Sequence, residues 1–205
     1  MDPAEPRPPF HDPRLVTGLL GGSFNPPHMG HVLLAVAGLC AAGLEEVWLA
    51  PAWEHPFGKP LAPFEERLAM CRLAVEPLGP RVKVDPIERD IHTPGEPSYT
   101  VRTVEALIAG HPGRAFRLLV GSDLAGEIST WRESERLLSL APPLIIPRLG
   151  REGGEGPHTL PAISATAVRE RIAAGADLRG WVPLSVARHI QSRGLYGARG
   201  ETIPR

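Results

Sequence analysis

Short apolar runs alternate with longer amphipathic segments along most of the chain, and this alternation limits the fold more than any other feature. Five runs are typical of buried strands: 16–20, 47–50, 82–84, 116–120 and 144–146. The intervening and following segments carry helical patterns: 28–42, 63–75, 99–110, 133–140, 167–174 and 183–193. Strands that alternate with helices in this way indicate a parallel sheet with helices on both faces.

We therefore predict the α/β class, with a Rossmann-like doubly wound parallel sheet and a small C-terminal helical segment. The length of 205 residues suits one domain, placed at 15–197. Residues 1–14 hold five prolines and few apolar side chains, which predicts a flexible Pro-rich arm. Residues 198–205 are predicted to form a flexible tail. In such sheets ligands bind at the carboxyl ends of the strands, so functional residues are expected at the strand-to-helix junctions.

Charge and hydropathy exclude several functional classes. The net charge of −1 gives no overall electrostatic attraction to nucleic acid, so we expect no nucleic-acid partner. No stretch approaches the roughly 20 apolar residues of a membrane helix, and we expect no membrane partner. Two cysteines and a first segment without an apolar leader favour a cytoplasmic protein. Both cysteines, Cys40 and Cys71, fall on apolar helical stripes, which predicts that both are buried.

The junction after the first strand, residues 21–31, has the features of a phosphate site. Gly21 and Gly22 let the backbone approach a ligand closely, and a following helix N-terminus attracts anions. The segment holds neither the dinucleotide Gly-x-Gly-x-x-Gly pattern nor a Walker loop. Instead, His28 and His31 lie three residues apart at the helix start and hence on one face, with Gly30 leaving space between them.

Three interpretations of the histidine pair are open: a metal site, a pair with no role, or two donors to phosphate oxygens. No third ligand stands nearby, and the helical zinc pattern uses a spacing of four. The glycines and the helix start favour the phosphate interpretation.

Residues 21–31 resemble the phosphate-binding His-x-Gly-His motif of the nucleotidyltransferase superfamily. More narrowly, they resemble the bacterial nicotinate mononucleotide adenylyltransferases. Further segments fit that family's order and spacing: 65–70, 97–103, 119–124, 130–131, 163–169 and 193–196. The His-x-Gly-His motif alone indicates only the superfamily. Its combination with Ser98-Tyr99-Thr100 and Gly121-Ser122-Asp123 is more specific, and the resemblance covers about residues 16–196.

The resemblance implies an enzyme that transfers an adenylyl group from ATP to nicotinate mononucleotide, giving deamido-NAD and pyrophosphate. It implies four catalytic residues: His31, His28, Arg169 and Lys59. It assigns ATP to Gly21, Gly22, Ser23, Phe24, His28, Gly30, His31, Gly121, Asp123, Ser164, Thr166 and Arg169. It assigns the mononucleotide to Ser23, Lys59, Tyr99, Thr100 and Trp131.

The implied cofactor is Mg²⁺ bound through the ATP phosphates, because no dedicated carboxylate cage or other protein metal site is visible. The implied partners are ATP and nicotinate mononucleotide. The sequence leaves a homo-oligomer open. One alternative function is adenylyl transfer to another acceptor, either nicotinamide mononucleotide or a different phosphorylated small molecule. The other is a regulator that binds nucleotide without catalysis. The presence of both histidines favours an enzyme over a regulator.

Several of these residues also have a purely structural interpretation. Ser164 and Asp123 fit ordinary helix N-caps, Trp131 fits a core filler and Lys59 a solvated loop residue. Ser98 is predicted to cap the helix that follows it. The chain departs from the family pattern at Phe57-Gly58-Lys59, and at Asn25 and Arg102, where the family commonly has Asp.

Overall fold

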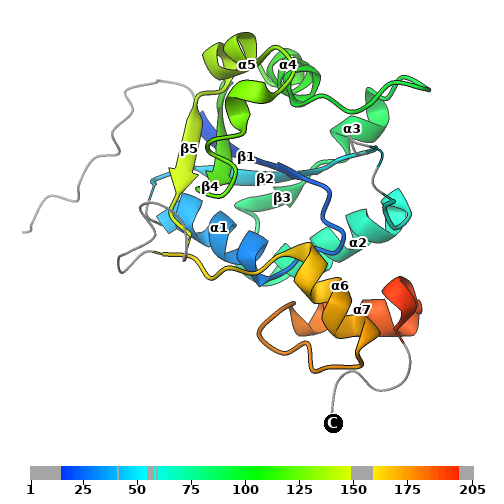
Figure 1. Ribbon diagram of the computed structural model, residues 1–205. Helices are drawn as coiled ribbons and strands as arrows, with labels where there is room; N and C mark the ends of the chain where they lie inside the picture. The colour runs from blue at the N-terminus through cyan, green and yellow to red at the C-terminus, as the bar shows by residue number, and fades with distance from the viewer. Residues whose placement is uncertain (1–14, 41, 55–57, 59, 149–158, 199–205) are drawn as a thin grey trace, which may run out of the picture.

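The computed structural model describes residues 15–40, 42–54, 58, 60–148 and 159–198. In these residues five parallel strands form one sheet in the order β3-β2-β1-β4-β5 (Figure 1). The strands are β1 (Leu15–Gly22), β2 (Glu46–Pro51), β3 (Val82–Val84), β4 (Arg114–Gly121) and β5 (Pro143–Ile146). The chain moves outward from β1 in one direction and then returns to its other side. This order is that of a doubly wound sheet, as predicted.

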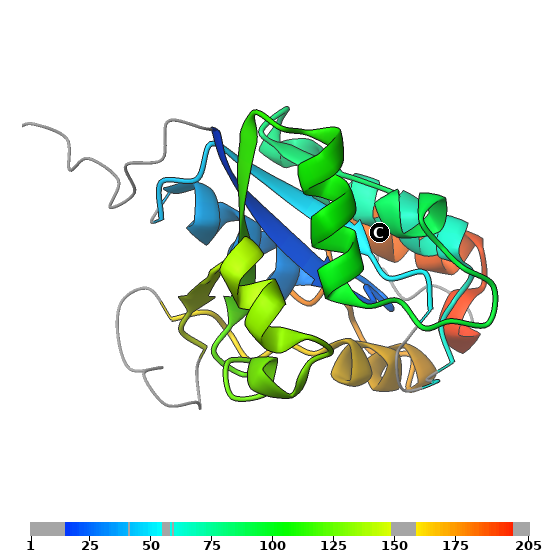
Figure 2. The ribbon, with the colours of Figure 1, turned by 90° about the horizontal axis from the view of Figure 1, so that it is seen from above.

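Helices cover both faces of the sheet (Figures 1 and 2). One face is covered by α1 (Met29–Cys40) and α2 (Phe64–Val75), and the other by α4 (Thr100–Gly110) and α5 (Ser134–Leu140). Each helix layer packs on the sheet through its own apolar cluster. The cluster under α1 and α2 includes Leu34, Leu49 and Leu119, and the cluster under α4 and α5 includes Val104, Phe116 and Leu137. The short helix α3 (Ile87–Asp90) follows β3, and single 3-10 turns occur at Glu76–Leu78 and Ile128–Thr130. The central strands β1, β2 and β4 are thus mostly buried from both sides, which explains why their runs are largely apolar.

The C-terminal helical segment consists of α6 (Ala165–Ala173), α7 (Leu184–Ser192) and a 3-10 turn at Leu195–Gly197. It packs beside α1 and α2 rather than forming a separate core. The Nε2 atom of His189 lies 2.6 Å from Oε2 of Glu66 on α2, and the hydroxyl of Ser185 donates to the Leu73 carbonyl. The amide of Met29, the first residue of α1, donates to the Trp181 carbonyl at 2.8 Å. The segment therefore supports the start of α1.

Two local predictions were wrong. Cys71 is buried, but Cys40 is exposed, and α1 buries Val32, Leu34 and Ala35 rather than Cys40. Because α1 is apolar on nearly every face, its periodicity alone does not show which face meets the sheet. Ser98 does not cap α4. Tyr99 takes the N-cap position without a side-chain hydrogen bond, and the Ser98 hydroxyl accepts from the Glu54 amide.

No helix among the described residues is long and apolar enough to cross a membrane.

Candidate active site

A cavity of about 710 Å³ opens beside the carboxyl end of β1, at the loop that leads into α1. The strand order reverses direction at β1, and such a switch point is the usual ligand site of a doubly wound sheet. The cavity brings together six predicted residues from two distant segments: Ser23, Phe24, His28, His31, Thr166 and Arg169. It is completed by residues that the sequence did not single out as functional, including Pro60, Ala62, Ala165, Leu195 and Tyr196.

The two histidines form a stacked pair at the start of α1. Their ring centroids lie 3.8 Å apart with the planes inclined by 29°. The backbone amide of His28 donates to Nδ1 of His31 at 3.1 Å. A neutral imidazole with Nδ1 as acceptor carries its proton on Nε2, so Nε2–H of His31 is the donor left for a ligand. Phe24, at a positive φ of 45°, also packs against His31, with ring centroids 4.7 Å apart.

Both histidines are neutral in the absence of ligand. Burial, together with the positive charge of Arg148, lowers the pKa of His28 from 6.5 to about 3. Burial first, and then unfavourable electrostatic coupling to His28 and Arg148, holds the pKa of His31 well below its usual value. Nδ1 of His28 is buried and has no hydrogen-bond partner among the described residues. The pair thus offers N–H donors rather than fixed charges, and a bound polyphosphate would raise both pKa values.

The lowered pKa of His28 predicts a loss of stability in mild acid. Unfolded His28 takes up a proton near pH 6.5, whereas the folded form does so only near pH 3, so stability falls as the pH drops below 6.5. Between pH 7 and pH 5 this group alone should remove about 2 kcal/mol of unfolding free energy. Urea unfolding at both pH values measures the loss. The variant His28→Gln should lose correspondingly less, and an equal loss in both proteins would contradict the prediction.

Arg148, which no sequence pattern pointed out, lies at the end of β5 beside the histidines. Its guanidinium forms an ion pair with Asp123 at 2.7 Å and is mostly buried. A side chain added at Gly30 would come within 2.8 Å of the Arg148 guanidinium and 3.0 Å of the His28 ring. One added at Gly121 would meet Asp123 and Arg148. A side chain at either position would thus displace the Arg148–Asp123 pair or the His28 ring, so the space at Gly30 that was predicted for a ligand is bordered by Arg148. Asp123 pairs with Arg148 and does not cap a helix.

The second wall of the cavity is the start of α6. Ser164 is the N-cap, and its hydroxyl accepts from the Ala167 amide, which fits the structural interpretation of this residue. Arg169 reaches back to the first loop and donates to the Asn25 carbonyl at 2.7 Å and to the Thr166 hydroxyl at 3.1 Å. The amides of the first turn of a helix have no intrahelical acceptor, so hydroxyl, amide and guanidinium donors converge here. This donor set suits a chain of phosphate groups.

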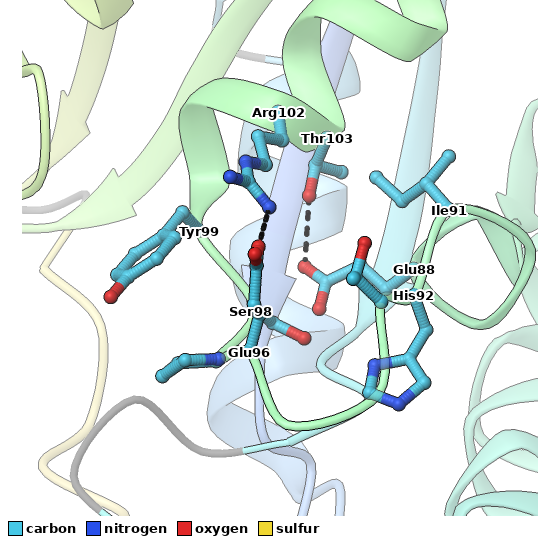
Figure 3. A pocket seen from close by; sticks show the side chains of 10 residues that line it. Glu88, Ile91, His92, Glu96, Ser98, Tyr99, Arg102 and Thr103 are labelled. Carbon is cyan, nitrogen blue, oxygen red and sulfur yellow. Dashed lines mark hydrogen bonds and ion pairs between the residues drawn. The ribbon is translucent and has the colours of Figure 1, made fainter.

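Of the residues expected to hold the mononucleotide, Ser23 lines this cavity, whereas Tyr99, Thr100 and Trp131 do not. Tyr99 lines a small second cavity of about 20 Å³ under the start of α4, together with Glu88, His92 and Arg102 (Figure 3). Arg102 pairs with Glu96, and Thr103 donates to Glu88 at 3.1 Å. Burial raises the pKa of Glu88, although hydrogen bonds from Ser98, Trp53 and Thr103 oppose this.

Trp131 packs against the apolar cluster between α4 and α5, as does Tyr99. It lines neither of the two cavities described, so its contact with a pyridine ring stays a prediction. Thr100 is the first residue of α4. Lys59 and the predicted arm at 1–14 lie outside the described residues, as do residues 199–205 of the predicted tail. Within the described residues no group of three or more His, Cys, Asp or Glu side chains is placed to hold a metal ion.

The doubly wound sheet, with a donor-lined cavity at its switch point, defines a nucleotide-binding α/β protein. A family model described as cytidylyltransferase-like matches residues 19–171. A probable nicotinate-nucleotide adenylyltransferase of Anaeromyxobacter sp. (strain K) is 46% identical over 178 residues, which cover 87% of this chain and 95% of that protein. A protein of the same name from Myxococcus xanthus (strain DK1622) is 35% identical, covering 91% and 97%.

The chain therefore belongs to the cytidylyltransferase-like family and, within it, to the nicotinate-nucleotide adenylyltransferases, which confirms the resemblance found in the sequence. A solved structure of the Plasmodium falciparum nicotinic acid mononucleotide adenylyltransferase, complexed with NaAD, has a TM-score of 0.70 and 20% identity. It covers 90% of this chain and 98% of its own. At that identity the likeness is one of fold.

Proposed function

We propose that this enzyme transfers the adenylyl group of ATP to nicotinate mononucleotide, producing deamido-NAD and pyrophosphate. The observation that carries the proposal is the cavity in which His28, His31, Thr166 and Arg169 converge at the switch point. The two segments that supply these residues are more than 130 positions apart in the sequence, yet they line one cavity. Membership of the adenylyltransferase family supports the same reaction.

In this reaction an oxygen of the mononucleotide 5′-phosphate attacks the α-phosphorus of ATP. A new phosphoanhydride bond forms as the bond to the β-phosphate oxygen breaks, and pyrophosphate leaves. No protein nucleophile is needed, so the side chains act by positioning and by stabilising charge. His31 donates Nε2–H to the α-phosphate oxygens, with His28 as a second donor. Arg169, Ser164 and Thr166 bind the departing β- and γ-phosphates.

ATP binds as its Mg²⁺ complex in this proposal, and the metal offsets the negative charge of the phosphates. The donors that line the cavity are imidazole, hydroxyl and guanidinium groups, a set that suits phosphate oxygens rather than a cation. The metal is thus carried by the substrate. The proposal keeps the ATP contacts assigned from the sequence to Gly21, Gly22, Gly30, Gly121 and Asp123. It also keeps Lys59 as a residue that lies beside the phosphates.

The function is tested by pyrophosphate release with Mg²⁺-ATP and a panel of phosphorylated acceptors. Nicotinate mononucleotide should give the highest kcat/KM, and the product should carry the mass of deamido-NAD. Release of pyrophosphate with another phosphorylated acceptor alone would replace the substrate assignment. Nucleotide binding without turnover on any acceptor would indicate a regulator instead.

We expect a preference of at least tenfold for nicotinate over nicotinamide mononucleotide. The start of α4 has no side-chain cap, so its first backbone amides are left to bind an anion. A carboxylate at a helix N-terminus gains about 0.3–1 kcal/mol, and up to about 2 when partly buried. Hydrogen bonds to a charged acceptor add to this gain, while desolvation opposes it.

The measurement is kcat/KM for both mononucleotides at equal Mg²⁺ and ATP. Equal values, or a preference for the amide, would contradict the acid assignment while leaving adenylyl transfer itself in place.

A further inference from the structure

Arg67, on the first turn of α2, is an arginine whose side chain is withdrawn from solvent. It is 1% exposed and is the largest of the fully buried side chains. The described residues place no carboxylate within ion-pair distance of it. An isolated buried cation is costly unless its N–H groups are hydrogen-bonded, so the contacts of this guanidinium explain why it is tolerated.

The guanidinium binds backbone carbonyls from two loops. Nη1 donates to the carbonyls of Ser23 at 2.8 Å and Ala52 at 2.7 Å. Nη2 donates to the Trp53 carbonyl at 3.2 Å, and Nε donates to the Ala62 carbonyl at 2.9 Å. Ser23 belongs to the β1–α1 loop that carries the histidines. Ala52, Trp53 and Ala62 are at the two ends of the loop between β2 and α2, in which Lys59 lies.

The same loop ends are held by bonds to their amides. The Ala52 amide donates to the Gly22 carbonyl at 2.9 Å, and the Trp53 amide donates to the buried carboxylate of Glu88 at 3.0 Å. The Ala62 amide donates to Oδ1 of Asn25 at 3.0 Å. Arg67 is the one group among the described residues that binds both ends of this loop and the β1–α1 loop together.

An apolar residue of similar length at position 67 would leave the four carbonyls without this donor. Lysine keeps the charge, but its single nitrogen lacks the planar fork that addresses carbonyls in several directions at once. The arrangement therefore fixes the distance between the histidine loop and the β2–α2 loop. Ser23 and Ala62 both line the large cavity, so that distance sets the width of the cavity on this side.

We propose that Arg67 is a positioning residue for adenylyl transfer, a buried clamp that holds the β1–α1 loop and both ends of the β2–α2 loop in the geometry that aligns the two substrates. The proposal rests on the proposed function for its catalytic part. Misalignment of reacting groups by about 1 Å can cost roughly 10²-fold in rate, so an imperfect clamp should act on kcat before it acts on substrate binding.

The test compares Arg67→Lys and Arg67→Met with a control, Arg72→Lys, an exposed arginine of the same helix. Each protein is assayed well below its own melting temperature, with the folded fraction measured. We expect kcat to fall roughly 10- to 100-fold in Arg67→Lys and further in Arg67→Met, with KM values within about threefold of wild type. The control should keep its kcat. A folded Arg67→Lys with kcat within twofold of wild type would overturn the positioning role.

Hydrogen exchange tests the clamp without using activity. In the wild-type protein the amides of Ala52, Trp53 and Ala62 should be protected, and in Arg67→Lys they should exchange at least tenfold faster while those of Val47 and Leu49 do not change. Unprotected amides in the wild type would overturn the clamp even if neither variant folds. If the wild-type protein lacked transferase activity, the proposed function would be rejected. The exchange experiment would still test the clamp, because it does not depend on activity.

Discussion

Replacing His31 by alanine should lower kcat by roughly 10²- to 10³-fold, the scale expected when one preorganised donor to a transition state is removed. The structure gives the physical reason. The His28 amide occupies Nδ1 of His31, so Nε2–H is left as a donor on the cavity side, held by stacking on His28 and packing against Phe24. Since this donor acts on charge that develops at the α-phosphate, KM for ATP should change much less than kcat.

His111→Ala is the matched control for this measurement. His111 follows the last residue of α4 and packs edge-on against Trp48, at the amino-terminal edge of the sheet and thus away from the cavity. Its kcat should stay within about twofold of wild type, the scatter expected for a residue outside the site. Steady-state pyrophosphate release gives both constants. A His31→Ala enzyme with near-normal kcat would remove His31 from the mechanism.

The second large effect is expected at Arg169. Arg169→Lys keeps the positive charge but loses the planar fork that now joins the Asn25 carbonyl to the Thr166 hydroxyl. Hydrogen bonds to charged groups are worth about 1.5–3 kcal/mol, which corresponds to roughly 10- to 150-fold in kcat/KM for ATP. Part of the loss should appear as a weaker affinity for pyrophosphate as a product inhibitor, because the proposed contact is to the leaving group.

Arg171→Lys, on the same helix, is the control for Arg169. The Arg171 guanidinium binds the Asp177 carbonyl and lies 4.6 Å over the Trp181 ring, so its role is to pack the C-terminal segment. We expect a lower melting temperature for this variant and an unchanged KM for ATP. If Arg169→Lys also kept a normal kcat/KM, Arg169 would act as a diffuse charge or lie outside the site.

Local pattern was enough to predict the sheet and its winding. The five strands are short, mostly apolar runs, and the central ones, which are buried from both sides, need no tertiary information to be recognised. The His28–His31 pair was equally readable, because two residues three apart at a helix start must share a face. Ser164 and Arg169 stand at the start of a second helix, and the family resemblance by itself assigns that helix and the first loop to the same ligand.

The tertiary structure decided which groups complete and support this site. Arg148 follows the last strand and Arg67 lies on α2, and nothing in their neighbouring residues shows that one packs against Gly30 and the other against the loop carbonyls. The exposure of Cys40 and the hydrogen bond between Ser98 and the β2–α2 loop likewise depend on contacts outside their own segments. Periodicity and capping report on bonds within one segment. A buried cation is placed by partners many residues away, and those partners come together only when the sheet has formed.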